Sequence, residues 1–326
     1  MKTFKTFYSF LLKYKSYFIT SILTGFVSTA LGNFTPFIYR YVVDNFYNFT
    51  IHSFLIVAGV YGATRLGMIL FGNLSDFFST KYSNPALIDS RIKIFNHLQN
   101  LDFAFHTTKK SGELISKIKR GDNAFSNIDT DLNGEIIGEI VRMAIALFAF
   151  SLINFKLIYV FLIAMGSMVA TSFYLIRRNM ASRADFNKEE DNISHLIADN
   201  LVNYETVKYF ASEKREVANL NKSFKKWNQS LWKFMKSFRK INVSVRLISS
   251  LAIISMLGIL SRDIVDKRIS VGDFVFVFTF ASQLFPNIEK IMFRFRSISR
   301  NYTDLKDYFA ILDYPLVVLE AKNPLK

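Results

Sequence analysis

The chain has 326 residues, of which 51% are hydrophobic and 16% aromatic, and it carries a formal net charge of +15. This composition is too apolar for an ordinary soluble domain of the same charge, so it favours a polytopic membrane protein. Cysteine is absent and the four histidines are scattered, which excludes disulfides, cysteine nucleophiles and a zinc motif of the usual spacing.

The first predicted element is an amphipathic helix over residues 1–16. Lysines alternate there with aromatic and leucine side chains, a pattern typical of helices that lie in the headgroup region of a bilayer. The segment has no small-residue cleavage site and lacks the composition of a transit peptide. We therefore expect it to stay attached, on the cytosolic side.

Six stretches are apolar over the roughly 20 residues that a membrane-spanning helix needs. They lie near residues 17–43, 52–78, 133–154, 157–177, 243–261 and 271–293. The polar segments between them repeat apolar residues at three- and four-residue steps, which predicts helical extensions rather than a separate soluble domain. The predicted fold class is all-α, with six transmembrane helices and long cytoplasmic extensions. Pro36 and Pro286 predict local kinks.

Basic residues indicate how the spans are oriented. Residues 44–51 contain no Lys or Arg, whereas residues 81–120 contain eight and residues 177–240 contain fourteen. Because Lys and Arg are retained on the cytosolic face, both large connections and both termini are expected in the cytosol. Arg262, Lys267 and Arg268 in an external connection disagree with this pattern. Topology accounts for the net charge, so no nucleic-acid partner is expected.

The same reasoning predicts a multi-pass protein of the cell membrane, the cytoplasmic membrane of a bacterium. The mitochondrial inner membrane stays open as an alternative.

Four arginines lie within the predicted spans, where ionisable side chains are costly. Arg40 and Arg246 lie near span ends, which favours side chains that extend to the membrane surface. Arg142 follows Glu139 by three residues, which predicts an ion pair within one helix. Arg65 lies deeper, and two interpretations remain open: it lines a substrate pathway and meets an anionic group, or it pairs internally with a carboxylate such as Glu139.

Four blocks occur in order along these spans: Tyr61–Gly67, Phe105–Gly121, Asn203–Phe210 and Ser270–Val275. In this order they resemble the transmembrane domain of ABC exporters, most closely the half-transporters of the mitochondrial and heavy-metal-tolerance type. The resemblance covers nearly the whole chain. It implies a dimer of membrane domains that forms the pathway for a small-molecule, peptide or lipid substrate.

The resemblance also implies two cytosolic coupling segments, near residues 102–113 and 203–213, that dock on ATP-binding domains. The coupling residues it implies are Phe105, His106, Gly112, Glu113, Glu205, Thr206, Lys208, Tyr209 and Phe210. Aromatic side chains would anchor the contact and charged ones would orient it. The alternative is that the aromatic side chains only pack between neighbouring helix extensions. Arg65, Asn242 and Gln283 are the candidate residues of the substrate pathway.

No Gly-Lys pair occurs in the chain, so the phosphate-binding pattern G-x-x-x-x-G-K-[ST] is absent. ATP and Mg are therefore expected on an ATP-binding domain, supplied by a partner protein or by a longer chain of which this is a part. Residues 17–300 are predicted to be the membrane domain, and residues 301–326 the start of a linker toward that ATP-binding domain. A membrane receptor or scaffold of exporter shape without a motor is the alternative function.

Overall fold

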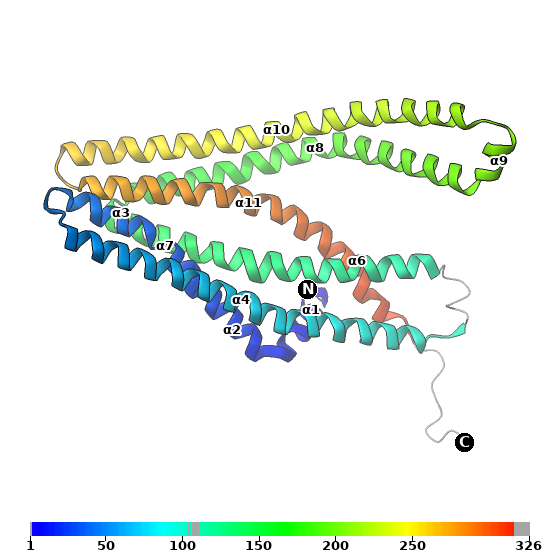
Figure 1. Ribbon diagram of the computed structural model, residues 1–326, viewed down its shortest axis with the longest axis horizontal. Helices are drawn as coiled ribbons and strands as arrows, with labels where there is room; N and C mark the ends of the chain where they lie inside the picture. The colour runs from blue at the N-terminus through cyan, green and yellow to red at the C-terminus, as the bar shows by residue number, and fades with distance from the viewer. Residues whose placement is uncertain (1, 104, 106–110, 316–326) are drawn as a thin grey trace, which may run out of the picture. The chain divides into compact units, whose positions relative to one another are not determined.

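The computed structural model describes residues 2–103, 105 and 111–315 (Figure 1). Within these ranges the regular structure is helical, as predicted. The helices are α1 Lys2–Leu11, α2 Lys15–Gly32, α3 Thr35–Asp44, α4 Ile51–Gln99, α6 Ser111–Asp129, α7 Ile137–Ile153, α8 Lys156–Val202, α9 Tyr204–Tyr209, α10 Glu213–Val265 and α11 Val271–Ala310. Three single 3-10 turns, η1 Leu12–Tyr14, η2 Phe46–Asn48 and η4 Ile311–Asp313, and a π-helical segment, η3 Thr130–Ile136, complete the list.

The prediction of six membrane spans is confirmed. Among the residues that the structure describes, six helical segments are long and apolar enough to cross a bilayer. They lie within Lys2–Asp44, Ile51–Gln99, Leu114–Ile153, Lys156–Arg177, Glu213–Val265 and Val271–Ile288.

The chain divides into two compact units. One comprises Met1–Ile158 together with Met256–Lys326, and the other comprises Tyr159–Ser255. We call them the large unit and the small unit. The large unit therefore contains both chain ends, and the small unit contains most of α8, all of α9 and most of α10.

The two predicted proline kinks differ in form. The first span is interrupted between α2 and α3, and Pro36 occupies the first turn of α3, where its missing N–H costs nothing. This prediction is confirmed. Pro286 lies inside α11, which continues as a helix to Ala310. The predicted boundary between residues 300 and 301 thus falls within a helix.

Small residues allow α2 and α4 to approach closely in the large unit. The Ser21 hydroxyl donates to the Ser75 carbonyl at 2.9 Å, and the Ser75 hydroxyl donates to the Ser21 carbonyl at 2.9 Å. The Ser28 hydroxyl donates to the Met68 carbonyl, also at 2.9 Å. Such interhelical hydrogen bonds between small residues replace the hydrophobic driving force that is missing between helices in lipid.

A second core joins α1 to the ends of α4, α6 and α11. Phe7 and Leu11 are fully buried, and the Phe7 ring lies 4.7 Å from that of Phe125. The apolar face of α1 is therefore directed into the protein, and only its polar face remains available for lipid headgroups. The placement of residues 1–16 at the membrane surface stays a prediction.

Tyr308 on α11 is the centre of this core. Its hydroxyl donates to Asp122 at 2.9 Å and accepts from Ser90 at 3.2 Å. Burial raises the pKa of Tyr308 above its ordinary value, so the hydroxyl remains a donor. The ring lies on Gly121 of α6, where an added Cβ would stand 2.2 Å from the Tyr308 Cγ. Gly121 is thus required for close packing of α6 and α11.

The opposite end of α11 is held by polar contacts with α3. The Gly272 N–H donates to the Asp44 carboxylate at 2.9 Å, and an added Cβ at Gly272 would stand 2.4 Å from that carboxyl carbon. Arg40 and Asp273 form an ion pair at 2.8 Å. Ser270 and Asp273 form a reciprocal capping box at the helix start. Arg40 is therefore paired with protein, although its side chain is 42% exposed, and its extension to the membrane surface stays a prediction.

The small unit is an antiparallel pair of helices, the α8 and α10 segments, joined through α9 (Figure 1). Phe186 contacts Trp227 and Phe234, with ring centroids 5.7 and 5.8 Å apart. Nearer the turn, the Asn200 amide lies 3.5 Å from the Glu216 carboxylate. Aromatic packing along the pair keeps these long extensions in register.

Gly121→Ala is the sharpest test of this packing. Gly to Ala inside a helix normally stabilises by about 1 kcal/mol, but here the methyl group collides with the Tyr308 ring. We expect destabilisation of about 1–3 kcal/mol, as for other overpacked cores, measured as a lower thermal unfolding midpoint.

Gly258→Ala is the matched control, because an added Cβ at that helical glycine meets nothing within 4 Å. It should leave the unfolding midpoint unchanged or raise it. An increase for Gly121→Ala would contradict the packing described above.

Candidate coupling site

The α9 helix is a single short helix between two long ones. α8 ends at Val202, and Asn203 leaves the helical region with φ −99° and ψ 27°. The Asn203 amide bonds back to the Asp199 carbonyl at 3.0 Å, which satisfies an end of α8. Glu205 lies in the first turn of α9, where a negative charge complements the helix dipole.

The exit from α9 is a Schellman turn. The Ser212 N–H donates to the Val207 carbonyl at 2.9 Å, and the Ala211 N–H donates to the Lys208 carbonyl at 3.1 Å. Ala211 has φ 47°, in the left-handed region that normally takes glycine at this position. A side chain is therefore held in a strained backbone conformation between α9 and α10.

A surface ion pair crosses the same turn. The Lys208 ammonium lies 2.8 Å from the Glu213 carboxylate, with both side chains about half exposed. The hydrogen bond from Lys208 lowers the pKa of Glu213, and the bond to Glu213 raises the pKa of Lys208. Exposed pairs contribute little stability, so its effect is to fix the direction of the Lys208 side chain.

The aromatic side chains of α9 point away from the small unit. Tyr209 is 84% exposed and Phe210 is 77% exposed, while Tyr204 is also exposed. Glu205 and Thr206 lie on the exposed surface of the same turn. This arrangement favours presentation of the aromatics to a partner over the alternative that they pack between helix extensions.

The other predicted coupling segment is only partly described. The Asp102 carboxylate accepts a hydrogen bond from the Phe105 N–H at 3.1 Å. The Phe105 ring is partly buried and packs on Tyr314, with centroids 4.9 Å apart. Phe103 is 83% exposed instead.

For three predicted coupling residues of this segment, the structure describes no side-chain contacts. His106 lies outside the described residues. Gly112 and Glu113 lie in the first turn of α6, but their side chains are outside the description. Their predicted roles stay predictions.

The candidate pathway residues lie on three helices. In the large unit, Arg65 of α4 stacks on Tyr61 at 5.2 Å, and its terminal nitrogen lies 4.0 Å from the Met68 sulfur. Gln283 of α11 is exposed. In the small unit, Asn242 of α10 is half-buried.

The pair predicted within α7 is confirmed, with Arg142 and Glu139 3.4 Å apart. Arg65 is not part of it. Among the described residues, no carboxylate lies within ion-pairing distance of Arg65, and its Nε has no hydrogen-bond partner. The interpretation in which Arg65 pairs with Glu139 is therefore wrong.

The chain is a membrane domain with six spans among its described residues. Two of its helices continue far beyond the membrane and end in a turn with exposed aromatic side chains, which is suited to contact with a soluble partner. Residues 18–288 match the family described as the ABC transporter transmembrane region. The chain belongs to that family.

Known members of the family are similar over most of this chain. The mitochondrial iron-sulfur clusters transporter ATM1 of Chaetomium globosum is 26% identical over 88% of this chain and 49% of its own length. The ATM1-type heavy metal exporter of Novosphingobium aromaticivorans is 25% identical, over 81% of this chain and 43% of its own. The chain thus spans about half the length of these relatives or less.

A solved structure of a bacterial Atm1-family ABC exporter with ATP bound has the same fold. Its TM-score is 0.73, with 24% identity over 94% of this chain and 55% of that one. At this identity the likeness concerns the fold alone.

Replacement of Ala211 tests the strained turn. Ala211→Gly removes the Cβ from a left-handed residue, a change of about 1 kcal/mol, so amide exchange of residues 203–213 should slow severalfold. Ala211→Val should accelerate it, because a β-branched side chain fits this region worse. Hydrogen–deuterium exchange with mass spectrometry measures both; equal rates in all three proteins would refute the assignment.

Proposed function

We propose that the chain is the membrane-spanning permease domain of an ATP-driven exporter, which forms the substrate pathway as a dimer. The observation that carries this proposal is α9, a short helix that exposes Tyr209 and Phe210 at the end of two long helices. Exposed aromatic side chains on a rigid base are suited to filling sockets on a partner. Membership of the ABC transporter transmembrane region family supports the same conclusion.

The long helices α8 and α10 would transmit motion from α9 to the membrane spans. From Arg177 to Val202, α8 extends roughly 40 Å beyond its span at 1.5 Å per residue, and α10 returns over a similar length from Glu213. Because the two are packed side by side, a displacement of α9 moves both. ATP that binds preferentially to the closed pair of ATP-binding domains would thereby shift the membrane domain between inward and outward openings.

The remaining parts follow from this assignment. ATP and Mg bind to the ATP-binding domains, which either a longer form of this chain or a partner protein supplies. The second membrane domain is an identical or a related chain. Phe105 with residues 102–113 forms the other contact with the ATP-binding domains, and Arg65, Asn242 and Gln283 face a small-molecule, peptide or lipid substrate.

We place the protein in the cytoplasmic membrane with both termini in the cytosol, on the distribution of Lys and Arg. Relatives named as mitochondrial make the inner mitochondrial membrane the alternative site. A receptor or scaffold without a motor is less favoured, since it gives no physical role to the exposed aromatics of α9.

Truncation of the α9 aromatics tests the coupling. Tyr209→Ala with Phe210→Ala should lower transport and substrate-stimulated ATP hydrolysis at least about tenfold, the loss typical of central interface anchors. The assembled transporter is assayed with its ATP-binding domains. Tyr47→Ala is the matched control, because Tyr47 is equally exposed but lies in the external loop. Equal activity of both variants would refute coupling through Tyr209 and Phe210, whereas the absence of any transport in the wild-type assembly would argue for the scaffold.

The orientation has a direct test because the chain has no cysteine. Tyr47→Cys and Phe210→Cys each introduce a single thiol. A membrane-impermeant maleimide should label the first in intact cells and the second only after permeabilisation. Labelling of Phe210→Cys in intact cells would reverse the proposed topology.

A further inference from the structure

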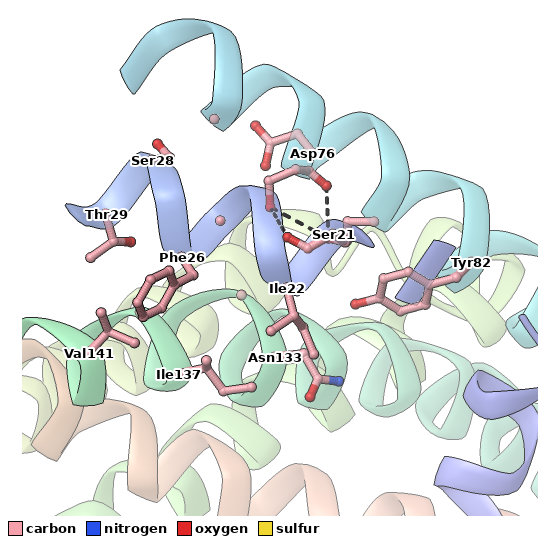
Figure 2. A pocket seen from close by; sticks show the side chains of 16 residues that line it. Ser21, Ile22, Phe26, Ser28, Thr29, Asp76, Tyr82, Asn133, Ile137 and Val141 are labelled. Carbon is pink, nitrogen blue, oxygen red and sulfur yellow. Dashed lines mark hydrogen bonds between the residues drawn. The ribbon is translucent and has the colours of Figure 1, made fainter. Parts of the chain in front are cut away.

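A polar cavity of about 210 Å³ lies between α2, α4 and the η3–α7 segment of the large unit (Figure 2). Serine hydroxyls from α2 and α4 line it, and their hydrogen bonds to helix carbonyls hold its walls together. Asp76 and Tyr82 of α4 and Asn133 of η3 complete the polar surface. The cavity therefore offers several polar groups to a ligand.

The one carboxylate among the described lining residues of this cavity is Asp76, whose side chain is also exposed to the surroundings. None of the described lysines or arginines lies within ion-pairing distance of Asp76. Behind the wall, Asp129 is 3% exposed and accepts hydrogen bonds from Tyr82 at 3.1 Å and Asn133 at 2.7 Å. No Lys, Arg or His occurs among the described lining residues. The nearby field therefore favours a positively charged group.

An apolar groove of about 370 Å³ adjoins the polar cavity. The two share Phe26 and Val141, and the groove continues along α7 past Ala144 and Ile145 to Phe148. Phe26 is 50% exposed and Phe148 is 68% exposed. From Val141 to Phe148 the helix rises about 10 Å, enough to follow part of an alkyl chain.

We propose that this composite site binds an amphiphile with a cationic head group. The ammonium group lies in the polar cavity beside Asp76, and the alkyl chain lies along the groove on α7. The direction of α7 supports this placement. The helix follows η3, which the distribution of basic residues places near the cytosol, and it runs from there toward the middle of the bilayer. The head group would thus lie at the inner membrane surface and the chain in the hydrocarbon.

Native mass spectrometry of the full chain tests the proposal independently of export. The chain is delipidated in a nonionic detergent, incubated with a ligand in the absence of nucleotide, and examined for retained ligand. The probes are dodecylamine and dodecanoate, which have equal chain lengths and opposite head charges. We expect one dodecylamine per chain and no comparable binding of dodecanoate. Asp76→Asn should weaken dodecylamine binding about tenfold through loss of the charge attraction.

Two matched controls separate the site from general effects. Asp185→Asn removes a charge from the exposed surface of α8 and is the control for Asp76→Asn. Ala144→Trp adds a large side chain in the groove. Its control is Ala170→Trp, which makes the same change at an exposed position of α8. Asp185→Asn and Ala170→Trp should bind like the wild type, whereas Ala144→Trp should lose binding. Ala144 is itself exposed, so the larger side chain does not enter a core.

Phosphatidylethanolamine and phosphatidylglycerol then identify the source of the ligand. Retention of phosphatidylethanolamine alone, lost in Asp76→Asn, supports a lipid of the bilayer as occupant. Retention of dodecylamine without either phospholipid supports an amphiphile from solution. Equal retention of dodecanoate, or equal binding by the Asp76→Asn and Asp185→Asn variants, overturns the proposal. An Ala144→Trp variant that binds normally but no longer dimerises overturns it too, because a second copy would then cover the groove.

Discussion

The structure depends on one constraint, which is that backbone N–H and C=O groups in a bilayer have to be satisfied within the protein. Unbroken helices are the direct solution, and this chain uses helices of 47, 49 and 53 residues that span the membrane and continue well past it. Because the same helix is both span and extension, motion outside the membrane cannot be separated from motion within it.

Side-chain polarity is then restricted to places where a partner exists. Ser21 and Ser75 exchange hydrogen bonds between helices, Arg142 pairs within α7, and Asp44 meets the backbone of α11 at Gly272. Each contact stabilises a helix packing that lipid alone would not favour. Arg65 Nε and both polar atoms of the Asn179 side chain are buried without such a partner, and the hypothesis about a substrate pathway rests in part on Arg65.

The helices could be predicted from the sequence because their signals are local. Six apolar stretches of sufficient length fix the spans, and the periodicity after Arg177 predicts that α8 continues beyond the membrane. The position of α9 was also predictable, since Asn203 and Ala211–Ser212 interrupt two regular patterns. The sequence shows which aromatic residues lie at α9. It does not show whether their side chains are exposed or packed, because exposure depends on neighbours distant in sequence.

Other features required coordinates for the same reason. The need for glycine at position 121 comes from Tyr308, and the pairing of Arg40 comes from Asp273, both more than a hundred residues away. Phe105 packs on Tyr314 while Phe103 is exposed, although only one residue separates the two in the sequence. The burial of the apolar face of α1 likewise depends on helices that fold against it from three other parts of the chain.

The proline within α11 gives this last helix a mechanical property of its own. One end is fixed by Asp44 and Arg40, and the other by Tyr308 in the second core. Between these anchors, Pro286 cannot donate a hydrogen bond to the Ser282 carbonyl, which favours bending of the helix at this position. We therefore expect a displacement of the inner end of α11 to bend the helix near Pro286, and Gln283 lies within one turn of that position.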